Sequence, residues 1–434
     1  MLMKFSKFCV ATLLLAILFS GCADRTASEE EGKTVISFSA PAPPEHRAVY
    51  QQVLRIFMRK HPEIKVKFYP TTGQNYEERI QTEMLAGEAP DVLWWQDEYF
   101  PGMVEAGQFL DITPFIEAEN YDLSDFFELS VKEFGHKGRQ YGLPQAWGAS
   151  VIFYNKDLFE QYGIEYNDDT WTWDAFIDAC QRLTRDIDGD GKIDMFGIQA
   201  NQGSSYSFIP LWAAGQEILN EDKTKCVINT PEAVRAYRWW AERWTKHKIQ
   251  IESFAEAGGG VVSIPDQAFA EGQVGMYETG AFFAHQLRSF TKFRWGIAYM
   301  PICPYTGKRS TRYYGDGYGI WSKSKHPKEA WELLKFLAGP VGQRMMAQLG
   351  RSVPARKSIA YSKYFDREDT SWEEHRLVDA IKHAHLQPIT TQFREFDNIV
   401  GQITDRVIIT QDLTPEEGLA LMEKEINKLL AEGS

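Results

Sequence analysis

Cysteine is scarce in this chain, with five residues among 434, and this scarcity excludes a disulfide-rich scaffold. Cys180, Cys226 and Cys303 are widely separated and lack the paired spacings of a zinc site. We expect these three to be small buried residues. A disulfide between any two of them stays open, and it would leave the third thiol unpaired.

Long apolar runs and positive charge are also in short supply. Beyond the N-terminus no run approaches the roughly 18 residues that a membrane helix needs, so no second membrane segment is predicted. Asp and Glu number 60 against 47 Lys and Arg, and this excess of negative charge argues against nucleic acid as a partner. With 44% apolar residues the chain can bury substantial cores. Its length suggests about two or three domains.

The N-terminus has the pattern of a processing signal. Lys4 and Lys7 precede an apolar stretch at 8–19 that is too short to span a bilayer, and Leu-Phe-Ser-Gly-Cys closes the stretch at Cys22. This box resembles a bacterial lipoprotein signal, which implies cleavage before Cys22 and lipidation of its thiol. The alternative is an ordinary secretory peptide with an incidental cysteine. The small, polar and acidic residues at 23–33 predict a flexible tether.

Hydrophobic periodicity predicts an α/β fold. A strand at 34–38, a helix with apolar residues spaced from position 49 to 57, and an alternating strand at 64–68 form a strand–helix–strand unit. Such a unit requires a parallel pair of strands. A helix at 76–85 then leads to a strand at 91–95. Further helices are expected at 327–338, 341–349 and 414–431.

Several short strings of residues follow one another in an order typical of one family. They are Ala-Gly-Glu-Ala-Pro-Asp-Val at 86–92, Tyr-Gly-Leu-Pro at 141–144, Phe-Tyr-Asn-Lys-Asp-Leu-Phe at 153–159 and Glu-Gly-Gln-Val-Gly-Met at 271–276. Taken in order, these segments resemble the family 1 extracellular solute-binding proteins, the carbohydrate-capturing subunits of ABC importers. Each string is weak alone, whereas their order along the chain is specific.

The resemblance implies a two-lobed, periplasmic-binding-protein-like α/β fold of type II, with the ligand cleft between the lobes. It also implies that the protein binds a carbohydrate outside the cytoplasm, with an oligosaccharide favoured, and that the permease subunits of an ABC importer are its partners. The N-terminal box implies that the protein is anchored to the cell membrane through lipidated Cys22. We expect a monomer that is not an enzyme and needs no cofactor. The implied signal peptide, tether, first lobe and second lobe are 1–21, 22–33, 34–147 with 315–362, and 148–314 with 363–434.

Aromatic rings and carboxylates suit a sugar site, because rings dock on the flat C–H faces of sugars while hydroxyl groups need polar partners. The chain contains 13 Trp and 19 Tyr. Strand alternation sends Trp94 and Trp95 to opposite faces, so one of these two rings is expected in the cleft. The strongest candidates, where strands of the similar family end at the cleft, are Trp94, Trp95, Asp97, Glu98 and Trp147. Candidates placed only by similar segments are Trp212, Glu278, Phe282, Asp316 and Tyr318.

The acidic loop at 186–194 is the clearest indication of a metal site. Its aspartates occupy alternate positions beside a glycine, as they do in the first nine places of a calcium-binding loop. The twelfth place is Gly197, so the bidentate acid of a full EF-hand is absent. The alternatives are a structural calcium remote from the ligand and a solvated Asp-Gly turn. The positions that would bind calcium are Asp186, Asp188, Asp190, Lys192 and Asp194.

Two other functions stay open at this point. A surface-anchored glycoside hydrolase would use Asp97 or Glu98 together with Glu278 as the acid and base that flank a scissile bond. A receptor of the same fold could instead bind a peptide or another solute, because specificity belongs to the site and not to the fold. The sequence specifies neither the identity, length and linkage of the sugar nor the partner permease.

Overall fold

The computed structural model describes residues 32–71, 76–200, 204–250, 265–290, 292–350, 352–365, 373 and 375–432. The expected signal peptide, Cys22 and most of the expected tether lie outside these residues. Within the described ranges, no helix combines the length and the apolar composition needed to cross a membrane. Cys180, Cys226 and Cys303 are buried free thiols, as predicted.

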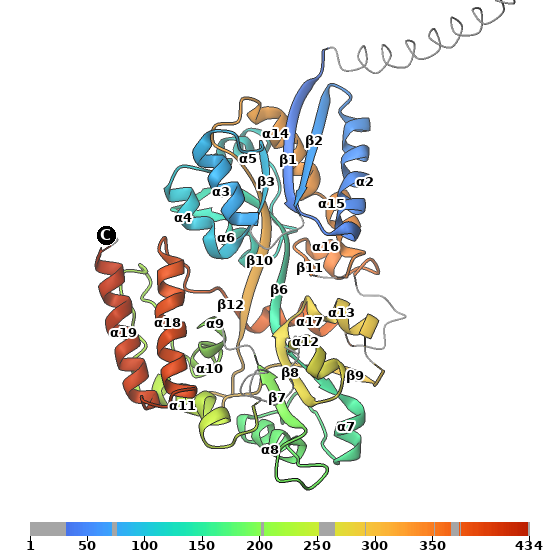
Figure 1. Cartoon of the computed structure of the whole chain (residues 1–434). Helices are drawn as coiled ribbons and strands as arrows, with labels where there is room; N and C mark the ends of the chain where they lie inside the picture. Colours follow the sequence, from blue (N-terminus) through green and yellow to red (C-terminus); the bar gives the residue numbers. More distant parts are fainter. Residues whose placement is uncertain are drawn as a thin grey trace, which may run out of the picture.

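The helices and strands form two groups, one drawn above the other in Figure 1. The upper group begins with β1 (Thr34–Pro41), α2 (Pro44–Lys60) and β2 (Ile64–Thr71), and the two strands pair in parallel as predicted. It continues with α3 (Tyr76–Ala86), β3 (Val92–Gln96), η1 (Asp97–Tyr99), α4 (Phe100–Glu105), α5 (Thr113–Glu119), α6 (Glu128–Glu133), β4 (Gly135–His136), β5 (Arg139–Gln140), α14 (Pro327–Leu337), α15 (Pro340–Ala347), β11 (Val353–Pro354) and α16 (Lys357–Ala360).

The lower group packs helices around a smaller set of strands (Figure 1). Its final helix matches the one predicted at 414–431, and its helix α11 (Pro231–Thr245) carries the buried rings of Trp240 and Trp244. The elements of this group are α7 (Lys156–Gln161), α8 (Trp173–Leu183), β7 (Phe196–Ala200), α9 (Ser204–Ser207), α10 (Ile209–Ala213), α11 (Pro231–Thr245), α12 (Pro265–Ala270), β8 (Val274–Gly280), α13 (Phe283–Phe290), β9 (Trp295–Ala298), α17 (His375–Asp379), η2 (Ala380–His383), β12 (Ala384–His385), α18 (Phe393–Ile408) and α19 (Pro415–Glu432).

Two long strands, β6 (Gly142–Asn155) and β10 (Thr311–Ile320), join the groups (Figure 1). The first half of β6 pairs antiparallel with β10, and its second half pairs antiparallel with β8 and β9. The hydrogen-bonded order is therefore β2-β1-β3-β10-β6-β8-β7. All of β6 is buried, because the strand has partners along its whole length and side chains packed on both faces.

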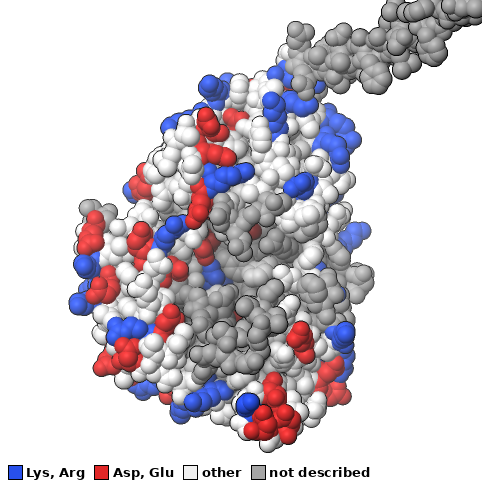
Figure 2. Space-filling view, viewed as in Figure 1, with Lys and Arg blue, Asp and Glu red and all other residues white. Residues whose placement is uncertain are grey.

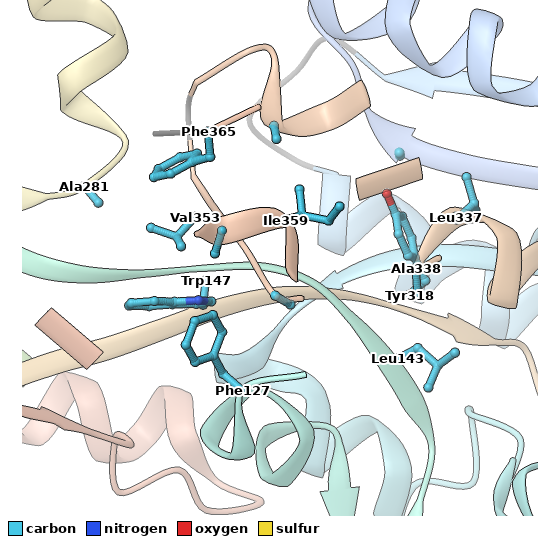
Figure 3. Close-up of a cluster of buried hydrophobic side chains, with 14 of the residues drawn as sticks. Phe127, Leu143, Trp147, Ala281, Tyr318, Leu337, Ala338, Val353, Ile359 and Phe365 are labelled. Carbon is cyan, nitrogen blue, oxygen red and sulfur yellow. The ribbon is translucent and has the colours of Figure 1, made fainter. Parts of the chain in front are cut away.

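The largest apolar core runs through the junction of the two groups. Trp147 of β6 stacks on Tyr313 of β10 with ring centroids 5.9 Å apart, and Phe127 meets the Trp147 ring edge-on at 5.3 Å. Figure 3 shows Trp147 between Phe127 and Val353, with Ala281 of the lower group nearby. The junction is therefore a packed layer and not a loose linker.

The expected lobe boundaries fall close to this junction. Residue 147 lies within β6, and residue 315 lies within β10. Residue 362 follows α16. These boundaries stay a prediction, since each crossing strand contributes pairing to both groups of elements.

Candidate ligand-binding site

A cavity of about 370 Å³ opens where the upper group meets Tyr206 and Phe282 of the lower group. This volume lies in the range of about 300 to 1,000 Å³ that is typical of small-molecule sites. The wall combines rings with hydrogen-bonding side chains. The polar residues that line it include Gln96, Asp97, Glu98, Gln145, Arg312 and Asp316.

Strand alternation explains which side chains of β3 and β10 reach the cavity. On β3, Trp94 lines the cavity while its neighbour Trp95 is fully buried on the opposite face. On β10, Arg312, Tyr314 and Asp316 occupy alternate positions, and all three line the cavity. Because β3 and β10 are hydrogen-bonded neighbours, their cavity-facing residues form one continuous wall.

A bulge shapes the edge of this wall. Asp316 pairs with Ala146 and Gly317 pairs with Pro144, so Gln145 has no partner in the ladder between β6 and β10. Gln145 lines the cavity, and its backbone oxygen accepts a hydrogen bond from the Ala355 amide instead. The bulge thus leaves Gln145 without a partner on β10 and shifts the pairing of β6 with β10 by one residue between Asp316 and Gly317.

Two charged side chains at the cavity form an ion pair. Arg312 forms an ion pair with Glu98 and lies over the rings of Tyr206 and Tyr314, at 5.4 Å and 5.6 Å from the ring centroids. Glu98 Oε1 also accepts a hydrogen bond of 3.1 Å from Gln387. The Glu98–Arg312 pair thus joins η1, the crossing strand β10 and the lower group.

Asp97 is the most deeply buried acid of the wall, with 2% of its surface exposed. Burial, followed by the charge of Glu98, raises the pKa of Asp97 to about 7. The ionised form of this carboxyl group is therefore less favourable than that of an exposed aspartate.

The structure brings together five of the ten residues that the sequence analysis selected. Trp94, Asp97, Glu98, Phe282 and Asp316 all line the cavity. Trp94 meets the ring of Tyr76 edge-on at 5.7 Å, which fixes the orientation of its indole.

Two of the strongest candidates lie in the core, and the expectation for them is corrected. Trp95 is fully buried behind β3, where its ring meets Phe109 edge-on at 5.6 Å. Trp147 is fully buried between Phe127 and Tyr313, because both faces of β6 are covered at this position. Neither ring forms part of the cavity wall.

Three of the weaker candidates are also displaced from the cavity. Trp212 is 4% exposed and stacks on His385 with centroids 5.3 Å apart. Tyr318 is fully buried, and its hydroxyl lies 3.2 Å from the hydroxyl of Tyr50. Glu278 is 1% exposed and accepts a hydrogen bond of 2.7 Å from Arg243. Each of these side chains has a structural partner in place of a ligand.

The sequence analysis missed Arg312 and Tyr314, although a signal for both was present. Asp316 was selected, and residues two and four positions earlier on a strand lie on the same face. Tyr206 and Gln145 had no comparable signal, since a short helix and a bulge bring them to the cavity.

The acidic loop between α8 and β7 holds its carboxylates close together. Oxygen atoms of Asp186, Asp188 and Asp194 lie within 4.8 Å of one another, and all three side chains are exposed. Asp190 accepts a hydrogen bond from the backbone amide of Lys192, whose ammonium lies 3.6 Å from the same carboxylate. Asp186 accepts from two glycine amides, as expected also of a solvated turn. Calcium binding stays a prediction.

The surface carries mixed charge. Figure 2 shows Lys and Arg interspersed with Asp and Glu over the visible face, without a broad area of positive charge among the coloured residues. Such a face does not hold a polyanion by charge alone.

Residues 33–344 match the family described as bacterial extracellular solute-binding protein. A putative binding protein of Brucella abortus is 26% identical over 82% of this chain and 83% of its own length. The arabinooligosaccharide-binding protein of Bacillus subtilis is 25% identical over 76% of this chain and 75% of its own. The crystal structure of an ABC substrate-binding protein from Listeria monocytogenes, in complex with cycloalternan, superposes with a TM-score of 0.79 at 24% identity and covers 92% of this chain and 99% of the other.

Proposed function

The chain belongs to the family of bacterial extracellular solute-binding proteins, and from this premise we propose that it captures a carbohydrate outside the cytoplasm and delivers it to an ABC importer. Its fold is the two-lobed α/β fold that the sequence analysis expected. The family consists of binding proteins and not of enzymes. In such a protein a ligand that contacts both lobes stabilises the closed arrangement through contacts that the open one lacks.

The composition of the cavity wall is the observation that carries the proposal. Trp94, Phe282 and Tyr314 offer rings to the C–H faces of a sugar, while Asp97 and Asp316 offer acceptors to its hydroxyl groups. The arabinooligosaccharide-binding relative supports an oligosaccharide as the ligand.

The charge of the wall favours an uncharged ligand. Among the described lining residues Arg312 is the sole Lys or Arg, and it is already paired with Glu98. A carboxylate or phosphate on the ligand would meet Asp97, Glu98 and Asp316 at close range, and like charges in a partly buried site repel strongly. We therefore propose a neutral sugar over an acidic one.

A thermal-shift screen of the mature protein tests the proposal. The panel contains neutral mono- and oligosaccharides, matched uronic acids, and short peptides. A ligand at a hundred times its Kd stabilises the native state by about 2.7 kcal/mol, which raises the melting temperature measurably. A shift with a neutral oligosaccharide, then confirmed by calorimetry, supports the proposal. A shift with peptides alone would favour the receptor for a non-sugar solute.

Binding without catalysis is part of the proposal. The hydrolase considered above needs Glu278 beside Asp97 or Glu98, whereas Glu278 is buried in an ion pair with Arg243 outside the cavity wall. Incubation of the purified protein with the oligosaccharide identified by the screen is expected to release no reducing sugar. Release that is abolished by Asp97→Asn would instead support hydrolysis.

We also propose that the mature chain is a monomer attached to the membrane through a lipid on Cys22. The support is the Leu-Phe-Ser-Gly-Cys box and the polar tether that follows it. The mixed surface charge offers no electrostatic route to an anionic membrane on the face shown in Figure 2.

A further inference from the structure

Behind the cavity wall, a second acid lies against Asp97. Glu133, the last residue of α6, is 7% exposed and does not line the cavity. A Cβ atom at Gly315 would collide with the Glu133 carboxylate, so a larger residue at this position of β10 would require the acid to move. The carboxyl groups of Glu133 and Asp97 are within hydrogen-bonding reach of each other.

The two groups leave oxygen atoms without a donor. Asp97 Oδ2 and Glu133 Oε1 are buried, and neither accepts a hydrogen bond from any described donor. The hydroxyl of Tyr313 donates to the other oxygen of Glu133, at 3.2 Å. Two ionised carboxylates are both acceptors and repel each other, so burying both in this state is costly. A proton on one of the two groups removes this repulsion and allows that group to donate a hydrogen bond to the other.

We propose that Glu133 is a positioning residue that keeps its proton and donates it in a hydrogen bond to Asp97, thereby holding Asp97 in place on the cavity wall. The inference goes beyond the proposed function because it concerns a residue outside the cavity and holds for any ligand. The charged or titratable groups that face the pair are Glu98 of η1 and Arg312, Tyr313 and Asp316 of β10. Of these, Arg312 is the cation, and it is paired with Glu98.

The expected pH dependence follows from the direction of both shifts. Burial, and next the neighbouring charge of Asp97, raises the pKa of Glu133 well above its ordinary value, and burial raises the pKa of Asp97 to about 7. Both groups therefore bind protons more tightly in the folded than in the unfolded chain. The free energy of unfolding then falls as the pH rises from about 4, the unfolded pKa, through the folded values.

Glu133→Gln tests the proposal without any ligand, because the glutamine amide donates the same hydrogen bond and cannot ionise. The melting temperature of the variant, relative to the wild type, is expected to rise by about 2 °C or more per pH unit between about pH 5.5 and about pH 8.5. The matched control is Glu128→Gln on the same helix, where the carboxylate is exposed and paired with Lys132. Its difference from the wild type is expected to stay constant over this range.

A flat or falling difference for Glu133→Gln would overturn the proposal. If this variant does not fold, Asp97→Asn replaces it, because the asparagine amide donates to the Glu133 carboxylate in the reverse direction and cannot ionise, and a rise of the same sign is expected. Infrared spectroscopy of the full chain gives an independent readout. The carbonyl stretch of a protonated carboxylic acid is expected near neutral pH in the wild type and in Glu128→Gln, and it is expected to weaken in Glu133→Gln. Absence of this band from the wild type would equally refute the shared proton.

Discussion

Replacing Glu278 by glutamine is expected to destabilise the lower group of elements without a direct effect on the ligand. Glu278 lies on β8 and Arg243 lies on α11, and their side chains are 1% and 2% exposed. Arg243 Nη1 donates to Glu278 Oε2 at 2.7 Å. The guanidinium also lies over the rings of three tryptophans, at 5.0 to 5.7 Å from the centroids. Glutamine retains the shape but leaves the arginine charge buried and uncompensated.

The burial of the Glu278–Arg243 ion pair determines the size of the expected loss of stability. Breaking a fully buried ion pair by removing one charge costs about 3 to 5 kcal/mol, whereas an exposed pair is worth about 0 to 1 kcal/mol. For a domain of 150 to 250 residues, 1 kcal/mol lowers the melting temperature by about 2 to 4 °C. Glu278→Gln should therefore lower the melting temperature by roughly 6 to 20 °C.

Thermal unfolding followed by tryptophan fluorescence measures the change, because the affected arginine is surrounded by tryptophan rings. The matched control is Glu242→Gln on α11, where Lys246 pairs with the partly exposed Glu242 at 3.1 Å, and its melting temperature should change by at most about 4 °C. The double variant Arg243→Met with Glu278→Leu should recover most of the loss, since it removes both charges. Equal melting temperatures for Glu278→Gln and Glu242→Gln would refute the reasoning.

Three further outcomes are expected. Trp94→Ala should weaken binding of the sugar found in the screen by about tenfold, as measured by calorimetry, and unchanged affinity would remove this ring from the site. Trp147→Ala should chiefly lower the free energy of unfolding, by about 3 to 5 kcal/mol. Cys22→Ser should move the protein from the membrane fraction to the soluble fraction with ligand affinity intact, and persistent membrane attachment would argue against the lipid. If calcium binds the acidic loop, excess chelator should lower the melting temperature of the wild type but not of Asp188→Asn, and equal behaviour of the two proteins would count against the site.

The helices and strands could be predicted well because their formation depends mainly on residues that are close to one another in the sequence. The strand–helix–strand unit at the start, the helices at 76–85 and 327–338, and the last helix are all present with ends shifted by only a few residues. The alternation on β3 likewise separates Trp94 from Trp95, because one face of the strand borders the cavity and the other faces a core. The same rule, applied to β10, would have added Arg312 and Tyr314 to the site.

The misplaced residues depend on contacts that no local pattern encodes. Trp147 lies within a strand that is covered on both faces, so neither alternation nor hydrophobicity distinguishes a ligand-binding ring from a core residue. Glu278 pairs with Arg243, which is 35 residues away on helix α11. Without knowledge of this partner, an acid in a strand is easily interpreted as a functional residue. Glu133 was not selected because its role depends on Asp97 and Gly315, which reach it from two other segments.

The unpaired position at Gln145 gives this cavity a site of easy variation. The Oε1 atom of Gln145 accepts no hydrogen bond from the described residues, so an exchange of this side chain removes no hydrogen bond at that atom and leaves the backbone bond from Ala355 in place. The residues on either side, by contrast, are held by pairing and packing. Substitutions at position 145 can thus change the ligand specificity of the cavity during evolution while the fold of the two lobes is retained.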